Sequence, residues 1–241
     1  MQSQYHFEFI VAQSNSAIAQ AYLLRSPCLS SHRYPIHIHK NASSAADAFN
    51  SHSLDRSRHD PKIWWVWVHQ DVYLPNNWDE QFQNAIALAE SQWPNLGIIG
   101  LYGIQNTGGK AIRTGSVLDR GTPLIEKALL PSLVDSLDEL LIATRSDLHL
   151  SFDPSLGFDL YGTDLVLEAQ KRGIVAAVVN APCEHWSSSP KSPPFPKDLI
   201  DRVVRSALYF EKKWQTHLPI FTPCFEIYTP GDIHRFIKQK P

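Results

Sequence analysis

One acidic side chain stands directly after the most apolar stretch of the chain. Residues 63–68 read Ile-Trp-Trp-Val-Trp-Val and lead into a polar triplet that starts with His69 and ends with Asp71. Such a short apolar run is typical of a strand buried on both faces of a parallel sheet, and open α/β sheets bind ligands at the carboxyl ends of their strands. A carboxylate there can hold a divalent cation against a phosphate. Asp71 could instead cap the turn before Pro75, and His69 could be a donor behind the metal ligands or a histidine at the core edge.

A second carboxylate lies in a glycine-containing segment, residues 157–164. Its last residue, Asp164, falls in the first turn of a predicted helix, where the helix dipole stabilises an anion. A carboxylate that stays ionised in this way is a candidate general base. The alternative interpretation is an aspartate that only stabilises the helix end.

A third group, Cys183-Glu184-His185, follows the apolar run 174–179. A histidine at a strand end can bind a metal through a neutral imidazole nitrogen, or it can be structural. Glu184 alternates with His185 and is expected to point the other way. Cys183 is expected to be a small buried apolar residue and not a nucleophile. The sequence contains no nucleophile elbow, phosphate-binding loop or dinucleotide-binding glycine pattern.

The composition excludes several classes of protein. The 241 residues carry a formal net charge of −2 with no dense basic run, which gives nucleic-acid binding little electrostatic support. The 3 cysteines are far apart and form no Cys-x-x-Cys pair, so a disulfide framework or cysteine zinc site is not expected. There is no signal-peptide pattern, and no apolar run has the roughly 20 residues that a membrane helix needs. We expect a cytoplasmic protein.

Strands and helices are predicted to alternate over the first ~180 residues. The predicted strands are 7–12, 36–39, 63–68, 96–104, 140–144 and 174–179. The predicted helices are 17–24, 45–53, one that begins at Asn77, 163–172 and 197–214. Residues 103–115 are predicted to be a loop or hairpin, and the Ser/Pro-rich residues 187–197 an exposed loop.

This alternation predicts an α/β fold with a mostly parallel central sheet flanked by helices. No internal repeat or linker is visible, so a single domain over residues 1–241 is the simplest interpretation. Its core would span about 7–190, with a helical C-terminal extension over about 197–241. The helix at 199–214 could pack internally or against a partner.

Taken together, these segments resemble glycosyltransferases of the GT-A fold, close to the large family 2 of inverting enzymes. The resemblance is carried by Val-His-Gln-Asp-Val-Tyr-Leu-Pro at 68–75, Gly-Phe-Asp-Leu-Tyr-Gly-Thr-Asp-Leu at 157–165 and Ala-Pro-Cys-Glu-His at 181–185. Residues 41–50 also look like the segment that precedes the metal-site strand of the family. The resemblance covers about residues 7–190. It implies a GT-A-like domain, a nucleotide-sugar donor, a divalent cation (Mn²⁺ or Mg²⁺) and an acceptor hydroxyl on a glycan or another molecule.

The resemblance also implies roles for individual residues. Asp71 matches the last acidic position of the family's Asp-x-Asp motif, whose first position is His69 here. His185 matches a position from which some relatives add a metal ligand, and Asp164 matches the carboxylate that activates the acceptor. The residues implied to border the nucleotide or its cation are Gln13, Asn15, Ser43, Asn50, His69 and Gln70.

The implied reaction is one displacement that inverts the anomeric carbon. The cation would stabilise charge on the leaving diphosphate while Asp164 removes the acceptor proton. His69 in place of an acid also favours the alternative of a non-catalytic descendant that binds a nucleotide or glycan. A nucleotidyltransferase is disfavoured, because the residues after the first strand are Ser14-Asn15-Ser16 and not a Gly-rich basic loop.

Overall fold

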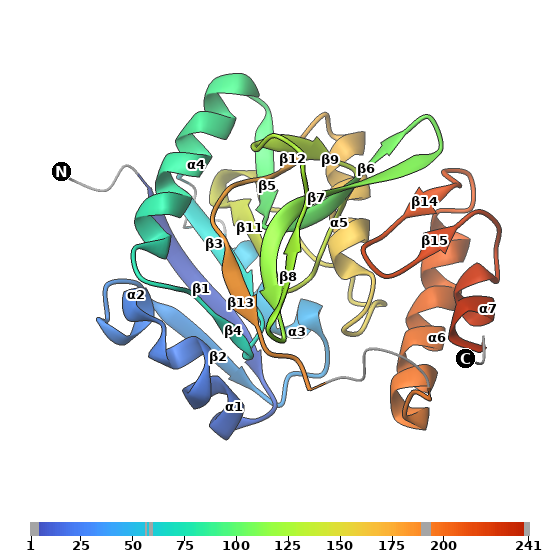
Figure 1. Ribbon diagram of the computed structural model, residues 1–241, viewed down its shortest axis with the longest axis horizontal. Coiled ribbons are helices and arrows are strands. Elements are labelled where there is room, and N and C mark those ends of the chain that lie inside the picture. Colours follow the sequence, from blue (N-terminus) through green and yellow to red (C-terminus); the bar gives the residue numbers. More distant parts are fainter. Residues whose placement is uncertain (1–4, 56, 58–59, 189–193, 239–241) are drawn as a thin grey trace.

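The computed structural model describes residues 5–55, 57, 60–188 and 194–238. This part of the chain forms a mixed α/β fold with helices on both sides of a central sheet (Figure 1). The strands are β1 (His6–Gln13), β2 (Ile36–Lys40), β3 (Ile63–Val68), β4 (Val72–Tyr73), β5 (Leu96–Gly100), β6 (Tyr102–Thr107), β7 (Lys110–Asp119), β8 (Thr122–Ile125), β9 (Ser132–Val134), β10 (Ser136–Leu137), β11 (Leu141–Arg145), β12 (Val175–Val178), β13 (Cys183–His185), β14 (Ile220–Phe221) and β15 (Glu226–Ile227). The helices are α1 (Ser16–Ala21), α2 (Pro27–Ser30), α3 (Ala45–Ser53), α4 (Trp78–Gln92), α5 (Tyr161–Lys171), α6 (Lys197–Lys213) and α7 (Asp232–Lys238), with short 3₁₀ turns at Leu23–Arg25 and Ser146–Leu148.

The central sheet has the strand order β2-β1-β3-β11-β5-β12-β9. Its parallel pairs join β1 to β2, β1 to β3 and β5 to β12. β11 is antiparallel to both of its neighbours, β3 and β5, and β9 is antiparallel to β12. The predicted α/β class is confirmed, but the sheet is mixed and not mostly parallel, because these two strands run against the others.

Strand β3 is buried on both faces, as its apolar run predicts. Trp64, Val66 and Val68 belong to one hydrophobic core, and Trp65 and Trp67 belong to the other. Side chains alternate across a strand, so a strand in the middle of a covered sheet must be apolar at every position. The polar residues that follow β3 therefore mark the point where the chain leaves the core.

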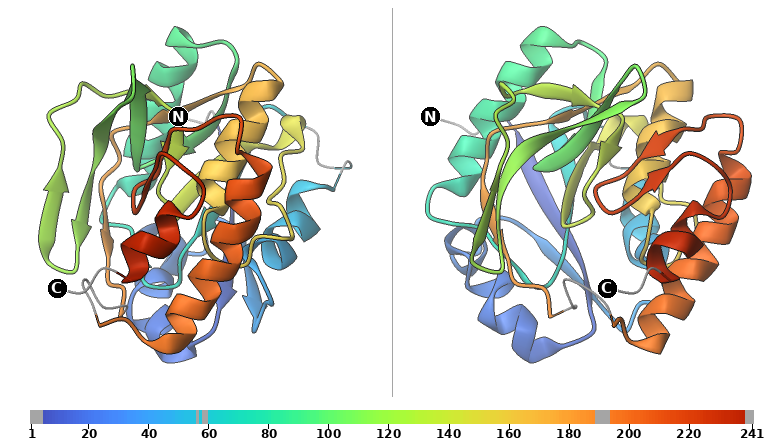
Figure 2. Two further views of the ribbon diagram at one scale, coloured as in Figure 1. Left: turned by 90° about the vertical axis from the view of Figure 1, so that its right-hand side faces the viewer. Right: turned by 45° about the vertical axis from the view of Figure 1, so that its right-hand side comes forward.

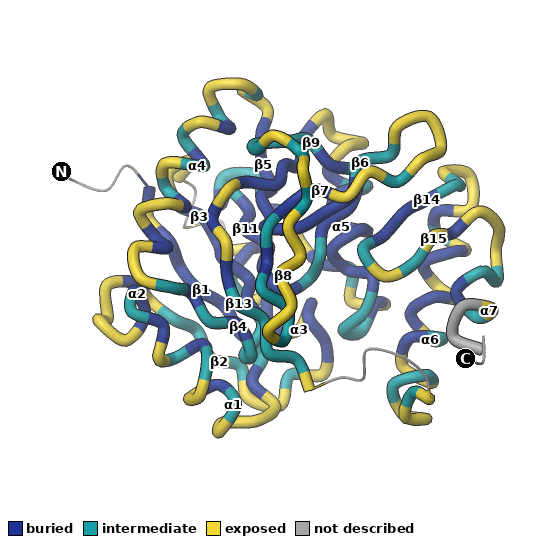
Figure 3. Tube along the Cα trace, viewed as in Figure 1, coloured by how far each residue is buried: buried dark blue, intermediate teal, exposed yellow. Residues whose placement is uncertain are grey.

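Helices cover both faces of the sheet. α4 packs Trp78, Phe82 and Ile86 into the first core, while α3, α5 and α6 contribute to the second. Figure 2 shows α6 lying alongside α5 on the outer side of the molecule, and Figure 3 shows buried positions concentrated in the central strands. The Ser44 side chain accepts a hydrogen bond from the Asp47 amide and so caps the start of α3.

A second sheet, with the order β10-β6-β7-β13-β4, lies against the central one. The strand predicted at 96–104 is two strands, because the chain passes from β5 in the central sheet to β6 in the second sheet at Leu101. The predicted loop or hairpin at 103–115 is the β6–β7 hairpin, whose turn uses Gly108 and Gly109 at φ of 60° and 84°.

The C-terminal extension consists of α6, the β14–β15 hairpin and α7. It packs at the side of the molecule that carries α5 (Figures 1 and 2). Val203, Ala207 and Phe210 of α6 join the second core, so this extension is part of the packed structure. Among the described residues, no helix combines the length and apolar character needed to cross a membrane.

Candidate active site

Two short strands bring residues that are far apart in the sequence to the carboxyl end of β3. β13 pairs antiparallel with β4, so that His185 lies opposite Val72, one residue after Asp71. On its other side β13 pairs in parallel with β7, which places His185 opposite Asp119. β-Sheet pairing therefore brings Asp71 and His185 together.

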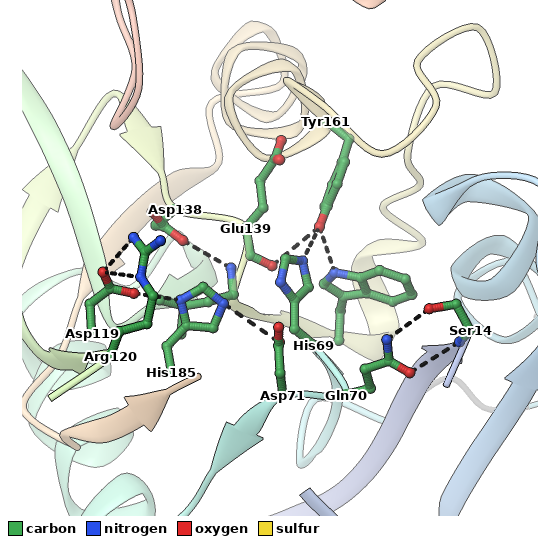
Figure 4. Close-up of polar contacts among 12 residues, drawn as sticks. Ser14, His69, Gln70, Asp71, Asp119, Arg120, Asp138, Glu139, Tyr161 and His185 are labelled. Carbon is green, nitrogen blue, oxygen red and sulfur yellow. Dashed lines mark hydrogen bonds and ion pairs between the residues drawn. The ribbon is translucent and has the colours of Figure 1, made fainter. Parts of the chain in front are cut away.

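The side chains of His69, Asp71 and His185 form a compact cluster (Figure 4). Each offers one ligand atom, and these atoms all lie within 4.8 Å of one another. The Oδ1 atom of Asp71 is 3.5 Å from Nε2 of His185. This oxygen is buried and has no hydrogen-bond partner. An orphaned buried carboxylate oxygen is costly unless a cation or donor compensates it.

Hydrogen bonds outside the cluster orient both imidazole rings. Nδ1 of His185 lies 3.1 Å from an oxygen of Asp119, so we infer that Nδ1 donates to that carboxylate, and Nε2 is the nitrogen that faces Asp71. Asp119 is held in turn by the guanidinium of Arg120 at 2.7 Å.

The ring of His69 is oriented by Tyr161. Nε2 of His69 is 2.9 Å from the Tyr161 hydroxyl, which accepts from the Trp67 indole and donates to the carbonyl of Glu139. Since the single hydroxyl proton goes to that carbonyl, Nε2 of His69 is the donor and Nδ1 keeps its lone pair. A histidine whose far nitrogen is held in this way is typical of metal ligands.

Burial and neighbouring charges shift the pKa values of all three groups in the cluster. Burial lowers the pKa of His69 below its usual value, against the opposing charge of Asp71, so its imidazole is neutral. Burial would raise the pKa of Asp71, but the ion pair with His185 and the charges of both histidines outweigh it and hold the pKa low. For His185, burial alone would lower the pKa, but the ion pair with Asp71 and the charges of Asp138 and Asp119 outweigh burial and leave the pKa above its usual value.

The residues present fit a divalent cation. Two imidazole nitrogens and one carboxylate oxygen are a donor set that suits Mn²⁺ and other first-row transition ions better than Mg²⁺, which prefers oxygen ligands only. The unpartnered oxygen of Asp71 supplies the place where such an ion would compensate the buried charge.

Two further carboxylates reach this region because β11 runs antiparallel to β3. The start of β11 lies beside the end of β3, and the His69 amide donates to the carbonyl of Leu140. Asp138 and Glu139, which come just before β11, therefore line a cavity with His69 and His185. Burial raises the pKa of Glu139 well above its usual value, and its Oε1 accepts a hydrogen bond from the Gly162 amide.

The cavity has a volume of about 480 Å³. Its polar end is formed by His69, Arg120, Asp138, Glu139 and His185. Its remaining wall is mostly apolar and comes from the segment before α5, from α6 and from the β14–β15 hairpin. Clefts of this size with a few convergent polar groups are typical of small-molecule sites.

Asp164 does not line this cavity, which corrects the prediction that it faces the acceptor. Its side chain is 1% exposed, and its Oδ1 accepts from the Trp214 indole at 2.7 Å. Nζ of Lys213 lies 2.7 Å from Oδ1 and 3.0 Å from Oδ2 of Asp164. Burial raises the pKa of Asp164, and the hydrogen bonds from Lys213 and Trp214 oppose that rise. Both oxygens are occupied by donors from α6 and its end, so Asp164 ties α5 to α6.

The residues implied to border the nucleotide make contacts within the chain. Oε1 of Gln70 accepts from the amides of Ser14 and Asn15, and its Nε2 donates to the Ser14 hydroxyl (Figure 4). The Asn15 side chain caps α1 by accepting from the amides of Ala17 and Ile18. Gln70 therefore fixes the turn after β1 to the turn after β3, beside the cluster.

The other three implied residues lie around the ends of β1 and α3. Gln13 is 7% exposed at the end of β1, where its carbonyl accepts from Asn41. Ser43 is exposed and bonds to Asp47 through its amide and hydroxyl. Asn50 does not present a free side-chain amide, because it exchanges two hydrogen bonds with the backbone of Phe152.

Sequence reasoning missed Asp119, Arg120, Asp138 and Glu139. Residues 119–122 show only a turn signal, Asp-Arg-Gly-Thr. Asp138 and Glu139 precede the predicted strand at 140–144, and a parallel placement of that strand would have put them at the opposite edge of the sheet. No residue pattern in the sequence marks the direction of β11.

Two solved structures match this chain at low sequence identity and with TM-scores below 0.5. The crystal structure of A197 from STIV is 10% identical with a TM-score of 0.44, over 73% of this chain and 82% of that one. The crystal structure of S. aureus TarS 1–349 in complex with UDP-GlcNAc is 10% identical with a TM-score of 0.46, over 86% of this chain. This chain spans 66% of the TarS chain in that structure. No protein-family model and no curated protein matches the sequence.

Proposed function

We propose that this protein transfers a sugar from a nucleotide-sugar donor to an acceptor hydroxyl with the help of a divalent cation. The observation that carries the proposal is the unpartnered Oδ1 of Asp71, which faces His185 beside His69 at the carboxyl end of β3 and next to a cavity. This position is the usual ligand crevice of α/β sheets. The sequence resemblance to GT-A glycosyltransferases supports the same assignment.

His69, Asp71 and His185 would hold the cation, and Gln13, Asn15 and Ser43 would border the nucleotide at the neighbouring strand ends. When bound, the cation would neutralise charge that develops on the leaving diphosphate. Gln70 acts by holding the turn at Ser14 and Asn15 in place. Arg120 lines the cavity beside His185 and adds positive charge at the same end.

Asp138 is the carboxylate best placed to accept the acceptor proton. It lines the cavity, and its Oδ1 accepts only the Leu140 amide among the contacts described. Glu139 accepts from the Gly162 amide and has a raised pKa, and Asp159 is paired with Arg202 through two hydrogen bonds. We therefore assign the general base to Asp138 in place of Asp164, with attack on the anomeric carbon in one inverting displacement.

A thermal-shift screen of UDP-, GDP-, CMP- and dTDP-sugars with and without Mn²⁺ tests the proposal. At least one donor should raise the melting temperature more with Mn²⁺ than without it, because ligand binding stabilises the folded state by mass action. Asp71→Asn should remove the Mn²⁺-dependent part. Glu80→Gln, which removes an exposed carboxylate from α4, should leave it unchanged. A shift that survives Asp71→Asn would contradict the proposed cation site.

Measuring turnover distinguishes the proposed transferase from a protein that only binds the donor. Asp138→Asn should lower donor hydrolysis or transfer by at least about 100-fold while donor binding stays within about twofold. The second candidate function, binding of a nucleotide or glycan without catalysis, is favoured by the imidazole of His69 at the first metal position. It would be supported by Mn²⁺-dependent donor binding with neither hydrolysis nor transfer in the native protein.

A further inference from the structure

The cavity next to the metal cluster is lined by two kinds of side chain. One part of the lining carries the ionisable groups of His69, Asp138, Glu139 and His185. The rest, called here the outer wall, is mostly aliphatic and aromatic and includes Leu137, Phe158, Leu160, Phe195, Leu199, Ile200, Val203 and Phe225. The C-terminal extension contributes several of these through α6 and the β14–β15 hairpin.

Helix α6 turns one face towards this cavity. Leu199, Ile200 and Val203 line the cavity. Val203 lies four residues after Leu199 and three after Ile200, so the three side chains share one side of the helix. Leu208 of the same helix is 59% exposed and does not line the cavity. The apolar wall is therefore a property of one helix face and not of α6 as a whole.

The polar groups of the outer wall are already satisfied by one another. Nε and Nη2 of Arg202 bind the two carboxylate oxygens of Asp159 at 2.9 and 3.1 Å. The Thr222 hydroxyl accepts from the amide of Phe225, and the Thr163 hydroxyl is bonded to Ser136 at 2.7 Å. A sugar ring placed here would find few open partners for its hydroxyls, and each unpaired polar group costs binding free energy.

We propose that the outer cavity binds an acceptor in which an aryl or alkyl group is attached next to the reacting hydroxyl. The hydroxyl lies at the polar end, within reach of Asp138, and the apolar group contacts the α6 face and Phe225. This inference rests on the proposed transferase function in one respect, namely that the bound hydroxyl is the group that receives the sugar. The preference for an apolar substituent rests on the cavity wall alone.

Two probes that differ only in the substituent test the preference. Phenyl β-D-glucopyranoside and methyl β-D-glucopyranoside share the same sugar hydroxyls, and their binding to the full-length protein can be followed by ligand-observed NMR titration. The phenyl compound should bind about tenfold more tightly, because its ring leaves water for an apolar wall and part of that gain is offset by the cost of association.

Two leucines of α6 provide the matched variants. Leu199→Gln should reduce the phenyl preference to about twofold, whereas Leu208→Gln should leave it at the native value. Circular dichroism and thermal unfolding of each variant show that the fold is kept. Equal affinities for the two probes in the native protein would overturn the proposal, and so would an unchanged preference in folded Leu199→Gln.

The same preparations separate this proposal from the proposed function. A phenyl preference that depends on Leu199, without any Mn²⁺-dependent donor shift, would support the apolar site and contradict the transferase assignment. A Mn²⁺-dependent donor shift without a phenyl preference would support the transferase and overturn the apolar acceptor site.

Discussion

Asp71 and Asp164 are two aspartates that the sequence assigns to chemistry, and their surroundings differ in one respect. Both oxygens of Asp164 are filled by donors of the chain, from Lys213 and Trp214. Asp71 keeps a buried oxygen with no donor, turned towards an imidazole nitrogen. A carboxylate whose donors come from its own chain stabilises the fold, whereas one left incomplete beside imidazoles is suited to an external cation.

Removing Asp164 should have the largest effect, and the effect should be on stability. Asp164→Leu leaves the Trp214 indole without its acceptor and removes one of the three carboxylates around the Lys213 ammonium, which should cost about 3 kcal/mol of unfolding free energy. Urea unfolding measures the change. If Asp164→Leu kept its stability but lost Mn²⁺ affinity, Asp164 would belong to the cation site and not to the stabilising contact with α6.

Asp119 sharpens the comparison, because it acts on the metal cluster through His185. In Asp119→Asn, the Nδ1 proton of His185 faces a neutral amide and not a carboxylate, so His185 is held less firmly as a ligand. The Mn²⁺ affinity should therefore fall by about 10- to 100-fold. Isothermal titration with Mn²⁺ measures this. Asp135→Asn is the matched control, since Asp135 also accepts hydrogen bonds but belongs to the contact with Asn106 and Gln170. Equal losses in both variants would show that the effect is not specific to the cluster.

The ion preference tests whether His69 is a ligand. His69→Asp replaces an imidazole by a carboxylate, so the affinity for Mg²⁺ relative to Mn²⁺ should rise by about tenfold. Competition titrations with the two ions give this ratio for the native protein and the variant. His217→Asp, an exposed change in the C-terminal extension, serves as the control. An unchanged ratio in His69→Asp would place His69 outside the ligand set.

The smallest expected effect concerns the pH dependence of the Asp164 region. Burial would raise the pKa of Asp153, but hydrogen bonds from Lys213, the Ser155 amide and Tyr209 outweigh it and lower the pKa. A lowered pKa stabilises the folded state above the unfolded-state value of about 4, and this stabilisation is lost as the pH falls through the folded-state value.

Asp153→Asn should therefore be less stable than the native protein by about 1 kcal/mol at pH 7. Denaturant unfolding at pH 7, 5, 4 and 3 should show the difference at the first two values and its decline at the last two. A difference of the same size at pH 3 would mean that the ion pair with Lys213 is not its source.

The fold could be predicted from the sequence wherever a pattern of apolar residues distinguishes a strand from a helix. The run at 63–68 is a strand buried on both faces, and the helix with Asp164 in its first turn ends before Gly173 at a φ of 72°. Strand direction could not be read in this way, because parallel and antiparallel neighbours bury the same side chains. The antiparallel β11 was missed for that reason, and with it Asp138 and Glu139.

The candidate site was predictable only in part. Asp71 and His185 follow apolar strands, and strand ends gather at one edge of a sheet, so their meeting could be expected. Asp164 gave the same signal as a catalytic carboxylate, an acid at a helix start. Its actual partners, Lys213 and Trp214, lie 49 and 50 residues further on, and no local pattern connects them to it.

The tie between α5 and α6 has a consequence for how this molecule could change over evolutionary time. The residues that anchor α6, Lys213 and Trp214, lie at its far end, while Leu199 and Val203 near its beginning face the cavity. Substitutions in the first turns of α6 can therefore accumulate without loosening the anchor. Natural variants or laboratory libraries that diversify Leu199 and Ile200, and keep the core residue Val203, should retain the fold while exploring new ligands.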